Sequence, residues 1–287
     1  MDVRELSSTP GLLPLYGKAA LGTVLPRGDQ LPERRLALAD VEIERAHLAR
    51  YDEVCGFRVS DELPTTYPHV LAFPLTMALM TDRSFPFPLL GLVHVANRIE
   101  QRRPIRASER LALRVWAEDL RDHPKGVQLD VVAECRVDGE VAWLGRSTYL
   151  RRGAGTQRTG PSTARDERAE DALESTAEPS ATLRVPGDIG RRYAAVSGDR
   201  NPIHMHSLAA KAFGFPGAIA HGMWMKARCL AALEGRLAPE FAVDAEFRSP
   251  LRIPGTARLA TRARDGGWDF ALRPAADGRP HVSGKVR

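Results

Sequence analysis

The 287-residue chain contains the same segment pattern twice, and this repeat is the feature that most limits its fold. Y-D-E-V-C-G-F at residues 51–57 matches Y-A-A-V-S-G-D at residues 193–199. V-L-A-F-P-L-T-M at residues 70–77 matches A-I-A-H-G-M-W-M at residues 218–225, and further pairs follow in the same order. Each match is weak, and the alternative is chance likeness between apolar segments. The shared order predicts two copies of one structural unit.

The order of predicted elements within a copy indicates a sheet that curls around a buried helix. In the first copy a helix at residues 45–55 precedes an apolar helix at Leu75–Met80. Four alternating segments then follow, at residues 92–99, 110–118, 127–137 and 141–150. Asp138-Gly139 joins the last two and is a tight-hairpin signal. We therefore expect an α+β fold with two antiparallel sheets, each wrapped around a central helix.

Composition divides the chain between the two copies. Residues 152–180 are rich in Gly, Ser, Thr, Glu and Arg and contain almost no large apolar side chains, which is typical of a flexible linker. We expect an N-terminal half with an arm at residues 1–151, this linker at residues 152–180, and a C-terminal half at residues 181–287.

Charge and hydropathy exclude several classes of protein. The net charge of +5 comes from basic residues spread along the chain, and aromatics are only 6%, so we expect no nucleic-acid binding. The excess charge can still attract a phosphate-bearing ligand or an acidic carrier protein. The longest apolar run, Val70–Met80, is too short to span a bilayer, so we expect no membrane insertion. Three distant cysteines and a polar N-terminus predict a cytoplasmic protein.

The second copy carries a candidate acid–base pair. Asp199 and His204 lie five residues apart on one Pro-containing loop, close enough to converge on one small molecule. Imidazole titrates near neutral pH, so a His/Asp pair suits general acid–base catalysis. The alternative is structural, because Asp199, Asn201 and Ser197 are all residues that cap turns. We take Asp199 and His204 as catalytic and Ser197 and Asn201 as supporting.

A predicted helix starts at His221-Gly222, shortly after that loop. Unpaired N–H groups at a helix N-terminus stabilise an oxygen that develops negative charge, so Gly222 N–H is the candidate oxyanion donor. His221 either orients this turn or only packs. His206 forms H-x-H with His204, but further ligands at metal-site spacing are missing from the sequence, so we expect no metal and no cofactor.

The first copy differs at each of these positions. Phe57 stands where Asp199 stands, Phe73 stands opposite His221, and Pro74 stands opposite Gly222. Proline has no backbone N–H to donate. The segment of the first copy that corresponds to the loop with His204 is also shorter than that loop. We expect this half to be non-catalytic, and its missing loop leaves room for something else.

The stretch from Tyr193 to Met223 resembles the hallmark motif of the MaoC-like, (R)-specific enoyl thioester hydratases, also called 3-hydroxyacyl-thioester dehydratases. The resemblance implies a double hot-dog fold with a degenerate N-terminal copy. It also implies that Asp199 and His204 hold a catalytic water while Gly222 N–H contacts the thioester carbonyl. The expected reaction is hydration of trans-2-enoyl thioesters or dehydration of (R)-3-hydroxyacyl thioesters in fatty acid metabolism. With such a substrate, the N-terminal copy would offer an apolar channel for a long acyl tail near Leu71 and Ala72.

The sequence leaves several points open. Coenzyme A or acyl carrier protein can present the substrate, and the chain can act as a monomer or a homodimer. Two rival functions remain, a non-catalytic acyl-thioester binding subunit and a hot-dog thioesterase.

Overall fold

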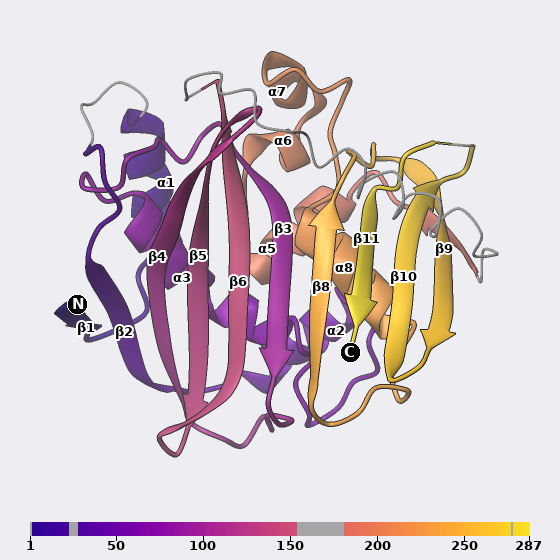
Figure 1. The fold of residues 1–287 in the computed structure, drawn as a ribbon, viewed down its shortest axis with the longest axis horizontal. Helices are drawn as coiled ribbons and strands as arrows, with labels where there is room; N and C mark the ends of the chain where they lie inside the picture. The colour runs from indigo at the N-terminus through magenta and orange to yellow at the C-terminus, as the bar shows by residue number, and fades with distance from the viewer. Residues whose placement is uncertain (1, 23–27, 154–180, 277) are drawn as a thin grey trace.

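The computed structural model describes residues 2–22, 28–153, 181–276 and 278–287, and it forms one continuous sheet with helices packed behind it (Figure 1). The strand order is β1-β2-β4-β5-β6-β3-β8-β11-β10-β9-β7. β1 pairs in parallel with β2, and every other pairing is antiparallel. The predicted α+β class with antiparallel sheets wrapped on helices is confirmed, and the two predicted sheets join edge to edge.

The first half of the chain contributes one contiguous part of this sheet. Its elements are β1 (Asp2–Leu6), α1 (Leu12–Leu21), β2 (Arg34–Val41), α2 (Arg45–Cys55), α3 (Tyr67–Met80), β3 (Leu92–Gln101), β4 (Leu111–His123), β5 (Gly126–Val137) and β6 (Glu140–Arg152). The helix at residues 45–55 and the four predicted strands are confirmed, with small shifts at their ends. The N-terminal arm is more regular than predicted, because it forms a strand, a helix and a second strand.

The second half repeats the order of elements and adds two short helices before its central helix. Its elements are β7 (Ala181–Val185), α5 (Ile189–Ser197), α6 (Pro202–Met205), α7 (Ser207–Ala212), α8 (Gly222–Ala231), β8 (Phe241–Phe247), β9 (Gly255–Arg264), β10 (Gly267–Pro274) and β11 (Val282–Val286). The division into halves at residues 1–151 and 181–287 stays our proposal. Most of the predicted linker at residues 152–180 lies outside the described residues.

The repeated heptapeptides meet in the core. α2 ends at Gly56 and α5 ends at Gly198, each in the left-handed conformation that glycine adopts at low cost. Tyr51 and Tyr193, which begin the two heptapeptides, are both almost fully buried, with ring centroids 6.4 Å apart. The two copies therefore contact each other through matching residues.

The central helix of the first copy is longer than predicted. It starts at Tyr67 and continues through Pro74, although a proline removes one intrahelical hydrogen bond. Burial explains the difference, since Val70, Leu75 and Leu79 are at most 5% exposed and their packing outweighs the lost bond. Pro74 consequently lies inside a helix, whereas its counterpart Gly222 begins one.

The seam between the two halves is the pairing of β3 with β8. Lys226 of α8 is fully buried beneath it. Its Nζ donates to Asn97 Oδ1 at 2.6 Å, to Asn97 O at 3.0 Å and to Val243 O at 3.3 Å. One side chain from the second central helix thus bonds a strand of each half, which ties the seam to the helix layer.

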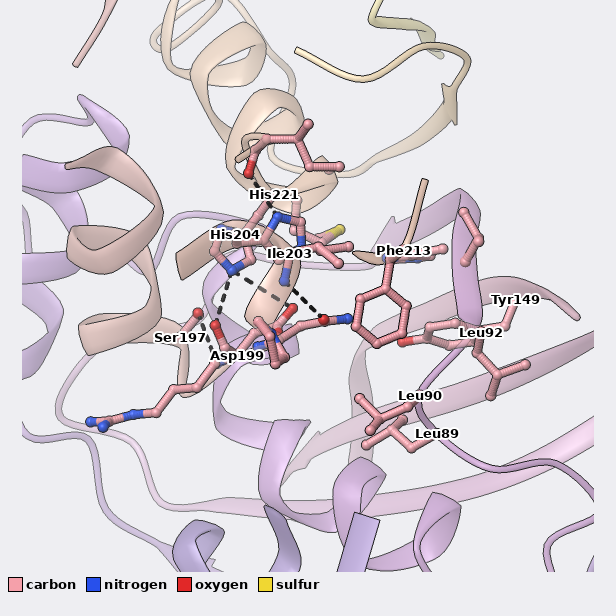
Figure 2. A pocket seen from close by; sticks show the side chains of 18 of the residues that line it. Leu89, Leu90, Leu92, Tyr149, Ser197, Asp199, Ile203, His204, Phe213 and His221 are labelled. Atoms are coloured by element: carbon pink, nitrogen blue, oxygen red, sulfur yellow. Dashed lines mark hydrogen bonds and ion pairs between the residues drawn. The ribbon is translucent and has the colours of Figure 1, made fainter. Parts of the chain in front are cut away.

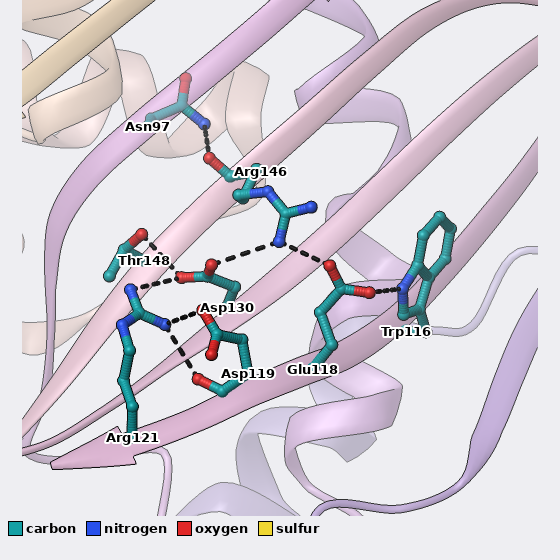
Figure 3. A network of polar contacts seen from close by, with 8 residues as sticks. All are labelled: Asn97, Trp116, Glu118, Asp119, Arg121, Asp130, Arg146 and Thr148. Carbon is teal, nitrogen blue, oxygen red and sulfur yellow. Dashed lines mark hydrogen bonds and ion pairs between the residues drawn. The ribbon is translucent and has the colours of Figure 1, made fainter.

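A polar network crosses strands β4, β5 and β6 (Figure 3). Asp130 is its centre, with a side chain only 5% exposed. Its carboxylate accepts from Arg121 and Arg146 at 3.2 Å each and from Thr148 Oγ1 at 2.7 Å. Arg146 also pairs with Glu118 at 2.6 Å. Because these partners come from three strands, the network fixes their register.

None of the helices in the described part of the chain combines the length and hydropathy that a membrane crossing requires.

Candidate active site

The loop after α5 presents Asp199. Gly198, in the left-handed conformation, turns the chain sharply at the helix end. Ser197 Oγ then accepts a hydrogen bond from Asp199 N at 3.1 Å, and Asp199 Oδ1 accepts one from Asn201 N at 3.1 Å. Ser197 and Asn201 therefore bond the backbone around the carboxylate, and these bonds between residues two apart also fit the turn-capping alternative, so their supporting role in catalysis stays a prediction. The Asp199 side chain is 34% exposed.

His204 sits on the one-turn helix α6, which Pro202 begins and Asn201 caps by accepting from Ile203 N. The ring is 9% exposed, and its Nδ1 lies 2.8 Å from Ile219 O. A carbonyl only accepts, so the proton of the neutral ring is on Nδ1 and the Nε2 lone pair is left to take a proton.

His221 contacts both predicted catalytic residues. It precedes α8 and is 3% exposed, with its ring stacked on that of His204 at a centroid distance of 3.7 Å. Its Nε2 donates to Asp199 O at 2.9 Å and lies 3.9 Å from Asp199 Oδ2. The sequence left open whether His221 orients the turn at the start of α8 or only packs; in the structure it packs on His204 and bonds the Asp199 loop.

Burial decides the charge of this cluster. Desolvation lowers the pKa of His204, while the nearby Asp199 carboxylate and the bond to Ile219 oppose that shift. Desolvation lowers the pKa of His221 further, and His204 adds to the effect. Both imidazoles are therefore neutral at pH 7, which is the form in which His204 can act as a base.

Gly222 is the first residue of α8, where a backbone N–H has no intrahelical acceptor. The ring of Phe247 covers this residue so closely that a Cβ on Gly222 would lie 3.0 Å from it. A side chain at this position would therefore fit only if the ring of Phe247 shifted. Gly222, His221, His204 and Asp199 all line one pocket.

That pocket has a volume of about 660 Å³ and is built from both halves. Asp199, His204 and His221 lie on one side of it, and Leu89, Leu90 and Leu92 lie with Tyr149 and Phe213 on the other (Figure 2). Among the described residues, the lining from α3 consists of His69, Phe73, Met77 and Met80. The expectation that Leu71 and Ala72 border the acyl space is wrong, because neither is among the residues that line the pocket and both pack with the hydrophobic core.

Two groups in the pocket were missed by the sequence analysis. Tyr16 of α1 reaches the Asp199 loop, and His69, His94 and Tyr149 form a row of stacked rings, with 6.2 Å and 4.8 Å between successive centroids. Burial lowers the pKa of His69 to about 4. Within residues 181–276 and 278–287, the described part of the second half, no segment corresponds to the arm that carries Tyr16, so the repeat gave no signal for it.

The acid–base cluster also has the composition of a metal site. Ligand atoms of Asp199, His204 and His221 lie within 4.8 Å of one another. His204 Nδ1 and His221 Nε2 each bond a backbone carbonyl, so one nitrogen of each ring is already engaged. The expectation of no metal stays a prediction.

Comparisons with known proteins place these features in context. The profile of the MaoC like domain matches residues 168–265. The 3-hydroxyacyl-thioester dehydratase X of Mycobacterium tuberculosis is 41% identical over 272 residues, which are 94% of this chain and 95% of that protein.

Solved structures show the same fold. The crystal structure of HtdX from Mycobacterium tuberculosis superposes with a TM-score of 0.77 at 38% identity and covers 88% of this chain and 99% of that one. A MaoC-like dehydratase from Phytophthora capsici gives a TM-score of 0.69 at 19% identity and covers 90% and 95% of the two chains.

Proposed function

The chain belongs to the family of MaoC-like dehydratases, and on this premise we propose that it hydrates trans-2-enoyl thioesters and dehydrates (R)-3-hydroxyacyl thioesters. The protein is then a hydro-lyase with a double hot-dog fold. The observation that carries the proposal is geometric: the buried His204, whose Nδ1 bonds Ile219 O, shares one pocket with the Asp199 side chain and with Gly222 at the start of α8.

In the hydration direction, Asp199 and His204 together hold one water. His204 Nε2 accepts a proton as the water oxygen bonds to C3 of the enoyl group, and the π electrons move to the thioester oxygen. Gly222 N–H stabilises the enolate that forms. The proton then returns to C2, so the sum of the steps is addition of one water. General acid–base catalysis of this kind contributes about 10² to 10⁴ in rate.

The supporting residues fix this geometry. Ser197 and Asn201 hold the backbone of the Asp199 loop, and His221 donates to Asp199 O while it packs on His204. The nearby dipole of α8 adds to the effect of the Gly222 amide. We propose that the reaction needs no metal and no cofactor.

Arginine side chains at the pocket suit a thioester on a phosphate-bearing carrier. Arg152 and Arg200 are exposed and line it, and Arg248 also lines it, with a side chain 4% exposed and paired with Glu246 at 3.0 Å. The phosphate of a pantetheine arm is common to coenzyme A and acyl carrier protein, so these arginines fit either carrier. We propose one of the two as the substrate carrier.

The acyl tail would extend toward the N-terminal half. Phe73, Met77, Leu90 and Leu92 give that part of the pocket an apolar wall.

The contact between the halves is made within one chain at the β3–β8 seam, so we propose a monomer or a homodimer. The three cysteines of the chain are buried and form no disulfide, which is consistent with a reducing cytoplasm.

One assay separates this function from its rivals. Crotonyl-CoA is mixed with the protein, and both the enoyl absorbance and the free thiol are followed. We expect the absorbance to fall while the thiol stays constant. Release of thiol would indicate a thioesterase, and binding without either change would indicate a non-catalytic subunit.

A further inference from the structure

The hydroxyl of Tyr16 bonds the loop on both sides of Asp199. It donates to Gly198 O at 2.7 Å and accepts from Arg200 N at 2.6 Å. Tyr16 lies on α1 in the N-terminal arm, more than 180 residues earlier in the chain, and it lines the same pocket. One side chain of the arm thus grips the backbone immediately before and after the carboxylate.

Other contacts of this loop come from its own half. Asp199 N donates to Ser197 Oγ, Asp199 O accepts from His221, and Asp199 Oδ1 accepts from Asn201 N. The peptide groups that flank Asp199 are held by Tyr16. Without its hydroxyl, the carbonyl of residue 198 and the amide of residue 200 lose this partner, and the two peptide groups keep only the bonds to Ser197 and His221, which hold the carboxylate less firmly.

The arm is also fitted to the loop by packing. Leu12 and Tyr16 are four residues apart and lie on one face of α1. A Cβ on Gly198 would lie 2.5 Å from Leu12 Cδ1, so the loop approaches the helix as closely as a glycine allows. Burial, and to a lesser extent the nearby Asp199 carboxylate, raises the pKa of Tyr16, so its hydroxyl keeps its proton.

We propose that Tyr16 is a positioning residue for the reaction, which aligns Asp199 with the water and the substrate. The site in the C-terminal half is therefore completed by the N-terminal arm. The inference rests on the proposed function, because Tyr16 acts through Asp199. A misplacement of about 1 Å in a reacting group can cost about 10² in rate.

The test is the variant Tyr16→Phe, which keeps the ring and removes only the hydroxyl. We expect kcat for crotonyl-CoA hydration to fall about 10- to 100-fold while KM changes less than about threefold. Tyr67→Phe is the matched control, since it also loses a hydroxyl hydrogen bond, to His47, but lies away from the loop. A wild-type kcat in Tyr16→Phe, or an equal loss in Tyr67→Phe, would overturn the proposal.

Amide exchange tests the same link without turnover. Hydrogen–deuterium exchange in a peptide that contains Arg200 should be faster in Tyr16→Phe than in the wild type and unchanged in Tyr67→Phe. Unchanged exchange at this loop would contradict the positioning role whatever the activity. If the wild-type protein does not hydrate crotonyl-CoA but the exchange responds as expected, the proposed function is wrong and the anchoring by Tyr16 is supported.

Discussion

The imidazole of His221 lies against that of His204, with ring centroids 3.7 Å apart and planes inclined by 28°. His221 bonds the carbonyl of Asp199 with its Nε2, and His204 bonds the carbonyl of Ile219 with its Nδ1. Each ring is thereby held in one tautomer, and the pair is kept neutral by burial. The arrangement places a neutral imidazole base beside a carboxylate.

Buried neutral histidines make stability depend on pH. The folded-state pKa of His69, His204 and His221 lies below the ordinary value of 6.5, to about 4 for His69. Below pH 6.5 these histidines take up protons in the unfolded chain but not in the folded chain. Their contribution to the free energy of unfolding is therefore fully present above pH 6.5 and is lost as the pH falls toward the folded pKa values.

We expect each such histidine to remove about 1.4 kcal/mol of unfolding free energy per pH unit in this window. Urea unfolding between pH 7.5 and pH 5 measures the loss. In His69→Phe, the slope of the unfolding free energy against pH should be smaller by the contribution of one histidine. An unfolding free energy that stays constant over this range would contradict the assignment of buried neutral rings.

Gly222 should not tolerate a side chain. Its Cβ would press on the ring of Phe247 at 3.0 Å, so Gly222→Ala must displace either that ring or the start of α8. We expect a loss of about 10² in kcat/KM, the usual effect of a lost oxyanion donor. The double variant Gly222→Ala with Phe247→Leu should recover part of the activity. No recovery would indicate that the methyl group acts on the amide alone.

Acyl-chain preference should respond to the wall of the pocket in the N-terminal half. Leu90 lines the pocket and is only partly buried, so Leu90→Phe fills acyl space at little cost to packing. We expect kcat/KM for a long-chain enoyl-CoA to fall about tenfold relative to crotonyl-CoA. Leu71→Phe is the matched control, because residue 71 is outside the lining. An equal change for both substrates would place the acyl tail elsewhere.

The sequence predicted those parts of the fold and site that depend on nearby residues. Asp199, His204, His221 and Gly222 fall within one short stretch, and turn formers and a helix start already bring them close together. Their shared pocket was therefore foreseeable, although their catalytic roles stay predictions.

Contacts between distant segments could not be predicted in the same way. The two hydrogen bonds of Tyr16 join the Asp199 loop of the second copy to the N-terminal arm, a segment that is not part of the sequence repeat. The early start of α3 depends on burial that outweighs a proline, and the seam depends on Lys226 reaching strands of both halves. These features come from tertiary packing, which a single sequence does not display.

The central claim is that Asp199 and His204 activate water for addition to an enoyl thioester. The most direct measurement is crotonyl-CoA hydration by Asp199→Asn and His204→Gln, each checked for a wild-type melting profile. Phe57→Leu, at the matching position of the first copy, is the control. We expect each site variant to lose about 10² to 10⁴ in kcat and the control to remain active. Wild-type turnover in both folded site variants would contradict the account.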